Sequence, residues 1–110
     1  MYVILTTKPG QFRTEPGPDL QPIEAHDFVF YGRLRASFLI AQIGAPTRVR
    51  LVDETEPVTV NLVPSKFLEK FATLEGARRE LQHLSPPGDA YAQLLPRAAA
   101  LFNQHTGHTA

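Results

Sequence analysis

Proline spacing is the feature that most limits what this chain can fold into. Ten of the 110 residues are proline. Proline has no backbone N–H and clashes with the preceding turn of a helix, so it ends or kinks helices. The prolines cut the chain into short pieces, and this favours strands and turns over long helices.

Apolar and β-branched runs predict a sheet of about five strands. These runs cover residues 2–7, 23–31, 33–43, 47–53 and 58–63. Residues 11–15 can add a short strand that pairs with the first run as a hairpin across Lys8-Pro9-Gly10. The acidic bend at 53–57 predicts a second hairpin, between 47–53 and 58–63.

Residues 33–43 fit two periodicities. Alternate residues from Leu34 would share one face of a strand, but Leu34, Phe38 and Ala41 also have helical spacing, with Gly44 as a C-cap. The middle of the segment, ASFLIA, is apolar throughout. We therefore favour a central strand that is buried on both faces.

The last third of the chain changes to helical spacing. Ser65 is a candidate N-cap for a helical turn or two over 66–71, and Thr73 is a candidate N-cap for a helix that ends near Leu84. A final helical segment follows over 90–104, limited by its proline, and the polar tail is expected to fray.

Strands first and helices last predict an α+β fold, in which a small, mainly antiparallel sheet carries C-terminal helices on one face. The predicted domain covers residues 1–84, and residues 85–110 form a helical appendage with a frayed tail.

Composition excludes several kinds of chemistry. The chain has no cysteine, which rules out disulfides, thiolate metal sites and cysteine nucleophiles. Eleven basic and eleven acidic residues give a net charge of zero, which argues against general nucleic-acid binding. The first residues lack the apolar core of a signal peptide, and no apolar run approaches a membrane span. We therefore expect a soluble cytoplasmic protein without membrane association.

Four arginines form two R-x-R pairs, which are Arg33 with Arg35 and Arg48 with Arg50. If their strands are adjacent, the guanidinium groups share one face, which together with Tyr31 would suit a carboxylate or phosphate. The simpler interpretation, which we weigh more heavily, is a solvated face neutralised by nearby acidic residues. Within the functional interpretation, an acidic protein partner is favoured over nucleic acid.

The histidines do not predict a catalytic or metal site. His26 and Asp27 are consecutive, so on a strand they point to opposite faces and cannot act as a base with its orienting carboxylate. His83, His105 and His108 lack nearby acidic or thiolate ligands. We predict no catalytic residue, no metal and no cofactor.

Aromatic residues gather in the first third of the chain. Beside arginines they can form a base-stacking platform, but a small domain without tryptophan needs such rings in its core, and the core is the favoured interpretation. They are Phe12, Phe28, Phe30, Tyr31 and Phe38.

The C-terminal segment carries an apolar stripe if it is helical. The stripe is Leu94, Leu95, Ala98, Leu101 and Phe102. It folds back on the sheet or forms an interface with a second chain, and we assign Leu94, Leu95, Leu101 and Phe102 to a predicted oligomer interface.

These patterns predict a small non-catalytic accessory or protein-interaction module in a larger assembly, acting as a homodimer or with a protein partner. The first alternative is a binder of, or enzyme on, a small anionic ligand held by the arginines and Tyr31. The second alternative is single-stranded nucleic-acid binding.

Overall fold

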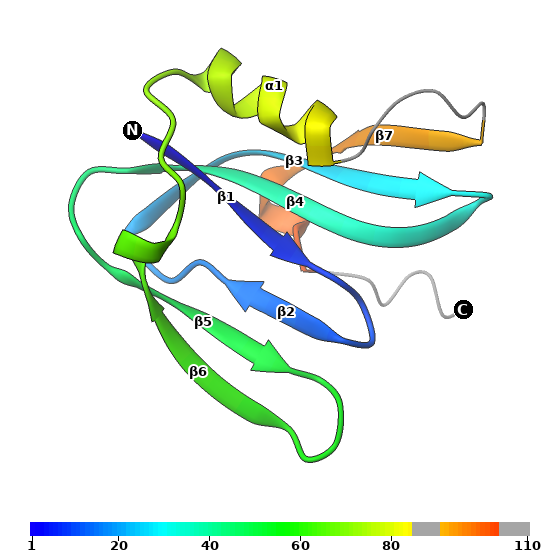
Figure 1. Cartoon of the computed structure of the whole chain (residues 1–110), viewed down its shortest axis with the longest axis horizontal. Coiled ribbons are helices and arrows are strands. Elements are labelled where there is room, and N and C mark those ends of the chain that lie inside the picture. Colours follow the sequence, from blue (N-terminus) through cyan, green and yellow to red (C-terminus); the bar gives the residue numbers. More distant parts are fainter. Residues whose placement is uncertain (85–90, 104–110) are drawn as a thin grey trace.

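The computed structural model describes residues 1–84 and 91–103, and Figure 1 shows them as two antiparallel sheets with one α-helix. The four-stranded sheet has the order β1 (Tyr2–Thr7), β4 (Arg33–Ile43), β3 (Leu20–Phe30), β7 (Ala92–Arg97). The three-stranded sheet has the order β2 (Phe12–Glu15), β5 (Arg48–Asp53), β6 (Thr59–Pro64). The helical elements are α1 (Leu74–Leu84) and two short 3₁₀ helices, η1 (Ser65–Phe67) and η2 (Ala99–Leu101).

Strand β4 lies at the centre of the molecule and is buried on both faces, as its apolar run predicts. Leu39 and Ala41 pack with Val49 of the three-stranded sheet. Phe38 and Ile40 point the other way and pack beneath α1. The four-stranded sheet therefore lies between two apolar clusters, with the helix on one side and the second sheet on the other (Figure 1).

The predicted α+β class is wrong, because the described part of the chain is mostly β, with two sheets and one α-helix. The predicted C-terminal helix over 90–104 is also wrong, since the described residues of this segment, 91–103, contain β7 and η2. Strand β7 pairs with the outer edge of β3 and supplies its backbone hydrogen bonds. This long-range requirement overrides the local preference of an alanine-rich segment for helix.

The segment predicted as an appendage shares its sheet and core with the rest of the chain. Strand β7 belongs to the four-stranded sheet, and Phe102 is 3% exposed within the cluster between the sheets. The tail expected to fray, residues 105–110, lies outside the described residues.

Several local predictions are confirmed. Residues 33–43 form a strand rather than a helix, and β5 and β6 form the predicted hairpin. The Thr73 hydroxyl accepts a hydrogen bond from the Gly76 N–H at 3.0 Å, so Thr73 caps α1.

One local prediction holds only at its turn, and another is wrong. The predicted first hairpin is limited to the antiparallel bridge between Lys8 and Phe12, because β2 itself pairs with β5 in the other sheet. The Ser65 hydroxyl does not cap a helix; it accepts a hydrogen bond from the Thr47 N–H at 3.0 Å, and only the 3₁₀ helix η1 forms here.

Candidate functional site

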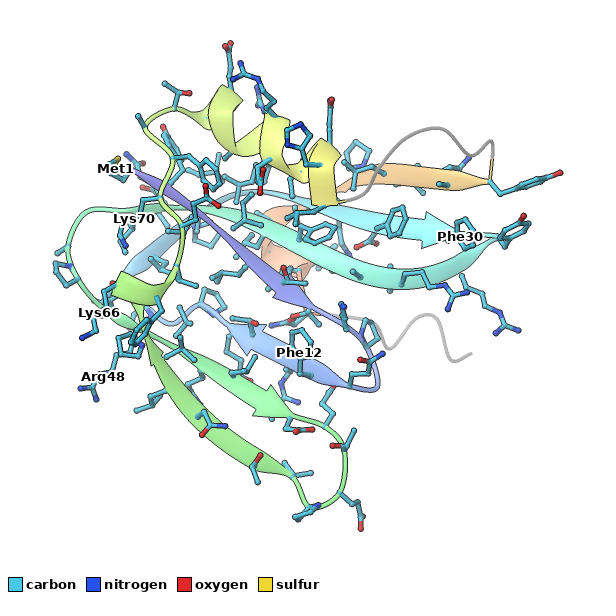
Figure 2. The ribbon with its side chains drawn as sticks, viewed as in Figure 1. Met1, Phe12, Phe30, Arg48, Lys66 and Lys70 are labelled. Atoms are coloured by element: carbon cyan, nitrogen blue, oxygen red, sulfur yellow. The ribbon has the colours of Figure 1, made fainter. Side chains whose placement is uncertain are left out.

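The four arginines lie on two different sheets. Arg33 and Arg35 belong to β4, whereas Arg48 and Arg50 belong to β5. The condition for a shared face, that these two strands are adjacent, is not met, because β4 pairs with β1 and β3. Figure 2 shows the separation: Arg48 lies at one end of the molecule, and Phe30, the cross-strand neighbour of Arg33, lies at the other. The two pairs therefore do not form one anion-binding face.

Arg50 is neutralised within the chain, as the simpler interpretation expects. Its guanidinium lies 3.4 Å from Glu15, which also accepts a 2.9 Å hydrogen bond from Arg13. Arg13 reaches Glu54 as well, at 3.2 Å, and these contacts raise the pKa of Arg13, with the Glu15 hydrogen bond the main cause. This network lies on the outer face of the three-stranded sheet, where such pairs add little stability.

Arg33 and Arg35 flank the tip of the β3–β4 hairpin, whose two-residue turn is Tyr31-Gly32. Both turn residues have positive φ, 52° at Tyr31 and 74° at Gly32, as a type I′ turn requires. Asparagine, aspartate and glycine suit the first position, and a bulky aromatic there is unusual. The conformation of Tyr31 is therefore not explained by turn preference.

The tip holds three aromatic rings in contact. Tyr31 stacks on Tyr91, with ring centroids 4.6 Å apart and planes 14° apart, and both residues are 59% exposed. Phe30 meets Tyr31 edge-on at 4.5 Å, and the Arg35 guanidinium lies 5.9 Å from the Phe30 ring centre. We call Phe30, Tyr31, Arg33, Arg35 and Tyr91 the hairpin-tip cluster.

Backbone pairing holds this cluster in place. The Tyr31 N–H donates a 3.0 Å hydrogen bond to the Tyr91 carbonyl, just before β7 begins. No local sequence pattern singles out Tyr91, because only the pairing of β7 with β3 brings it to the tip. This hydrogen bond fixes the backbones of the two tyrosines next to each other.

The charge at the tip is positive. Arg33 and Arg35 are exposed, and within residues 1–84 and 91–103 neither makes an ion pair with a carboxylate. A guanidinium that makes no ion pair within the described chain can donate its forked N–H groups to an external carboxylate or phosphate. Two of the four predicted arginines, together with Tyr31, therefore remain in one candidate surface.

His26 and Asp27 point to opposite faces of β3, as predicted. Asp27 Oδ1 accepts hydrogen bonds from the Ser37 hydroxyl at 2.7 Å and from Arg97 at 3.2 Å. His26 lies on the helix side, with its buried Nε2 3.7 Å from Glu24. Since Ser37 donates to a carboxylate on the face away from the histidine, these residues do not form a nucleophile with its base.

Metal-binding residues are scattered. The described part of the chain contains no group of three or more histidines and carboxylates placed to hold a metal ion. His83 lies on α1, 3.3 Å from Glu80. His105 and His108 lie outside the described residues.

The predicted C-terminal apolar stripe does not form, because its residues belong to a strand and a 3₁₀ turn. Leu94 packs against the cluster beneath α1, and Phe102 is buried between the sheets. Leu95 and Leu101 are exposed. No single face therefore carries all four residues of the predicted interface.

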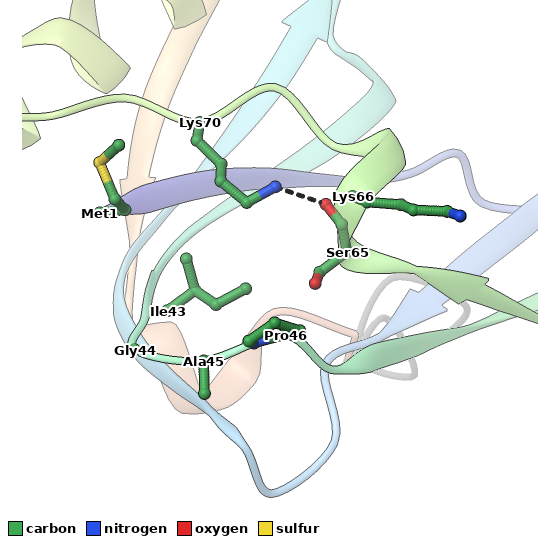
Figure 3. A pocket seen from close by; sticks show the side chains of 8 residues that line it. All are labelled: Met1, Ile43, Gly44, Ala45, Pro46, Ser65, Lys66 and Lys70. Carbon is green, nitrogen blue, oxygen red and sulfur yellow. Dashed lines mark hydrogen bonds between the residues drawn. The ribbon is translucent and has the colours of Figure 1, made fainter.

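A pocket of about 320 Å³ lies between the β4–β5 connection and the segment after β6 (Figure 3). Its floor is apolar, and the Lys70 ammonium beside it donates to the carbonyls of Ser65 at 2.7 Å and Leu68 at 3.3 Å. Its lining is Met1, Ile43, Gly44, Ala45, Pro46, Ser65, Lys66 and Lys70. The predicted binding residues, the four arginines and Tyr31, do not line it.

Comparison with protein-family models, with curated proteins and with solved structures finds no match for this chain. Over the described residues, no helix has the length and apolar character needed to cross a membrane.

Proposed function

We propose that this protein is a small non-catalytic interaction module, and that its hairpin-tip cluster binds an acidic segment of a partner protein within a larger assembly. The observation that carries this proposal is the exposed Tyr31–Tyr91 stack beside two arginines without an ion pair to a described carboxylate. Tyrosine and arginine supply much of the binding energy at protein interfaces.

Preorganisation supports this role. The stack and the backbone hydrogen bond between Tyr31 and Tyr91 fix two rings that would otherwise lose rotamer freedom on binding. The cation beside Phe30 is likewise held near a ring. A partner that supplies carboxylates to Arg33 and Arg35 and an apolar side chain to the tyrosines would bind both the charged and the aromatic side chains of the cluster.

A random peptide display library tests the proposal. We expect the wild-type protein to enrich acidic peptides, and the triple variant Tyr31→Ala/Arg33→Ala/Arg35→Ala to bind the enriched peptides at least about tenfold more weakly. Arg48→Ala is the matched control, since it removes an exposed arginine from the other sheet. Failure to enrich acidic peptides, or equal binding by the triple variant, would contradict the proposal.

Single-stranded nucleic acid is the second candidate, favoured by the same exposed tyrosine stack, because bases stack on aromatic rings. Fluorescence anisotropy with an oligothymidylate separates the two functions. Affinity that falls steeply with salt and is lost in Tyr31→Ala supports the second candidate; absent or salt-independent binding rules it out.

A further inference from the structure

Within residues 1–84 and 91–103, no strand pairs with the outer edge of β6. This strand is the last in the order β2-β5-β6, and Figure 1 shows no described element along its outer side. The opposite edge strand, β2, is tied to the other sheet, because the Thr14 hydroxyl donates to the Thr6 carbonyl at 2.6 Å. An open edge presents a row of N–H and C=O groups on which another strand can pair.

The ladder fixes which residues of β6 present these groups. The Ser65 N–H donates to the Thr47 carbonyl at 2.8 Å. Thr47 and Ser65, which lie opposite each other just beyond the ends of β5 and β6, are therefore a hydrogen-bonded pair of the ladder. Hydrogen-bonded and non-hydrogen-bonded pairs alternate along an antiparallel ladder. The next residue, Pro64, then occupies a non-hydrogen-bonded position, where proline costs no ladder bond.

Continuing this alternation places Leu62 and Val60 in the outward set, whereas Val63 and Asn61 bond to β5. Two adjacent outward residues therefore offer two N–H groups and two C=O groups at the edge. Their side chains lie on the same face of the sheet, since alternate residues of a strand do.

These outward residues also form an exposed apolar strip. Val58, Val60 and Leu62 are 65%, 49% and 55% exposed. Residues 58–64 contain no charged side chain. Proteins that must keep an edge strand free place charges or proline on it; β6 carries no charge, and Pro64 stands only at its last position.

We propose that a second copy of this chain pairs with β6, antiparallel and about a two-fold axis, so that two three-stranded sheets form one six-stranded sheet. In a two-fold pair each strand faces itself, so any charge on it would oppose its own copy. An uncharged strand avoids that repulsion. Leu62 lies opposite Arg50 of β5 in the ladder, and the Arg50 guanidinium is already paired with Glu15. This surface is separate from the hairpin tip, and the inference does not depend on the proposed function.

Sedimentation velocity of the full chain tests the dimer. A short strand interface is small, so we expect dissociation in the range of about 1–100 µM. Val60→Lys should remain monomeric over that range, because it places like charges at the two-fold interface. Leu95→Lys is the matched control: it charges a similarly exposed leucine on β7, and its dimer should persist.

A second variant tests the backbone pairing directly. Val60→Pro removes an outward N–H without removing a ladder bond to β5, so it should also be monomeric while circular dichroism stays unchanged. If Val60→Lys perturbs the fold, Leu62→Lys replaces it. A wild-type monomer up to about 300 µM, a dimer that survives the β6 variants, or a dimer that Leu95→Lys also dissociates would overturn the inference.

Discussion

Arg97 on β7 donates a hydrogen bond to Oδ1 of Asp27 on the neighbouring strand β3, at 3.2 Å, and their side chains are only 13% and 16% exposed. The Ser37 hydroxyl donates to the same oxygen at 2.7 Å. A buried carboxylate needs such donors, because its charge has lost water. This contact links β7 to Asp27 and Ser37, a polar pair on β3 and β4.

Arg97→Met should destabilise the protein by about 1–3 kcal/mol, because it leaves the partly buried Asp27 carboxylate without its cation. The double variant Arg97→Met/Asp27→Asn should recover part of that loss, since the uncompensated charge is gone. Urea denaturation measures both free energies. A double variant no more stable than Arg97→Met would show that the cost comes from packing and not from charge.

A chain ending at Leu84 should fail to fold. The truncation removes β7, Phe102 and Asn103, and the last of these accepts a hydrogen bond from Thr7 and donates to the Thr14 carbonyl, at 2.7 and 2.9 Å. Near-ultraviolet circular dichroism and amide dispersion in NMR spectra report the result. A well-folded truncated chain would instead support the predicted division at residue 84.

Tyr31→Asn should leave stability unchanged or raise it by up to about 1 kcal/mol, because asparagine suits positive φ while the lost ring contact is mostly exposed. Binding of the acidic peptides should fall in the same variant. Thermal unfolding and peptide titration are the two measurements. A loss of stability above about 1 kcal/mol would assign Tyr31 a structural role.

The ion pair between Glu24 and Arg78 should make stability depend on pH in the acid range. Arg78 donates to both carboxylate oxygens of Glu24, at 2.6 and 3.2 Å, and this hydrogen bonding lowers the pKa of Glu24 below its usual 4.5. A lowered folded-state pKa gives stability that is complete above the unfolded pKa and is lost as pH falls through the folded one.

Arg78→Gln should therefore be less stable than wild type at about pH 7, and the difference should shrink by about pH 3. Denaturant titrations at both values measure it. Arg79→Gln, on the exposed side of the same helix, is the control and should show no such dependence. If the stability difference between Arg78→Gln and wild type stays constant across this pH range, the ion pair does not cause the loss of stability in acid.

Strand positions were predictable because alternation and turn residues act locally. Residues 2–7 and 33–43 form strands with the predicted bounds, and the double burial of β4 follows from its apolar run. Pairing was not predictable in the same way. The chain passes from β4 into the other sheet, and no local pattern distinguishes that path from a hairpin.

The candidate site was half predictable for the same reason. Tyr31, Arg33 and Arg35 are neighbours in sequence, so one turn brings them together. Tyr91 joins them only because β7 pairs with β3, against the helical preference of its segment. Local periodicity does not predict contacts that depend on which distant strands pair with each other.

The position of β7 also sets the order in which the chain can complete its fold. Strands β3 and β4 are joined by a two-residue turn and can pair as soon as both have been synthesised. The other edge of β3 must wait for β7, which leaves the ribosome only after both strands of the second sheet's hairpin and the helix. During translation that edge is therefore an exposed template for pairing with other nascent chains until β7 emerges and covers it.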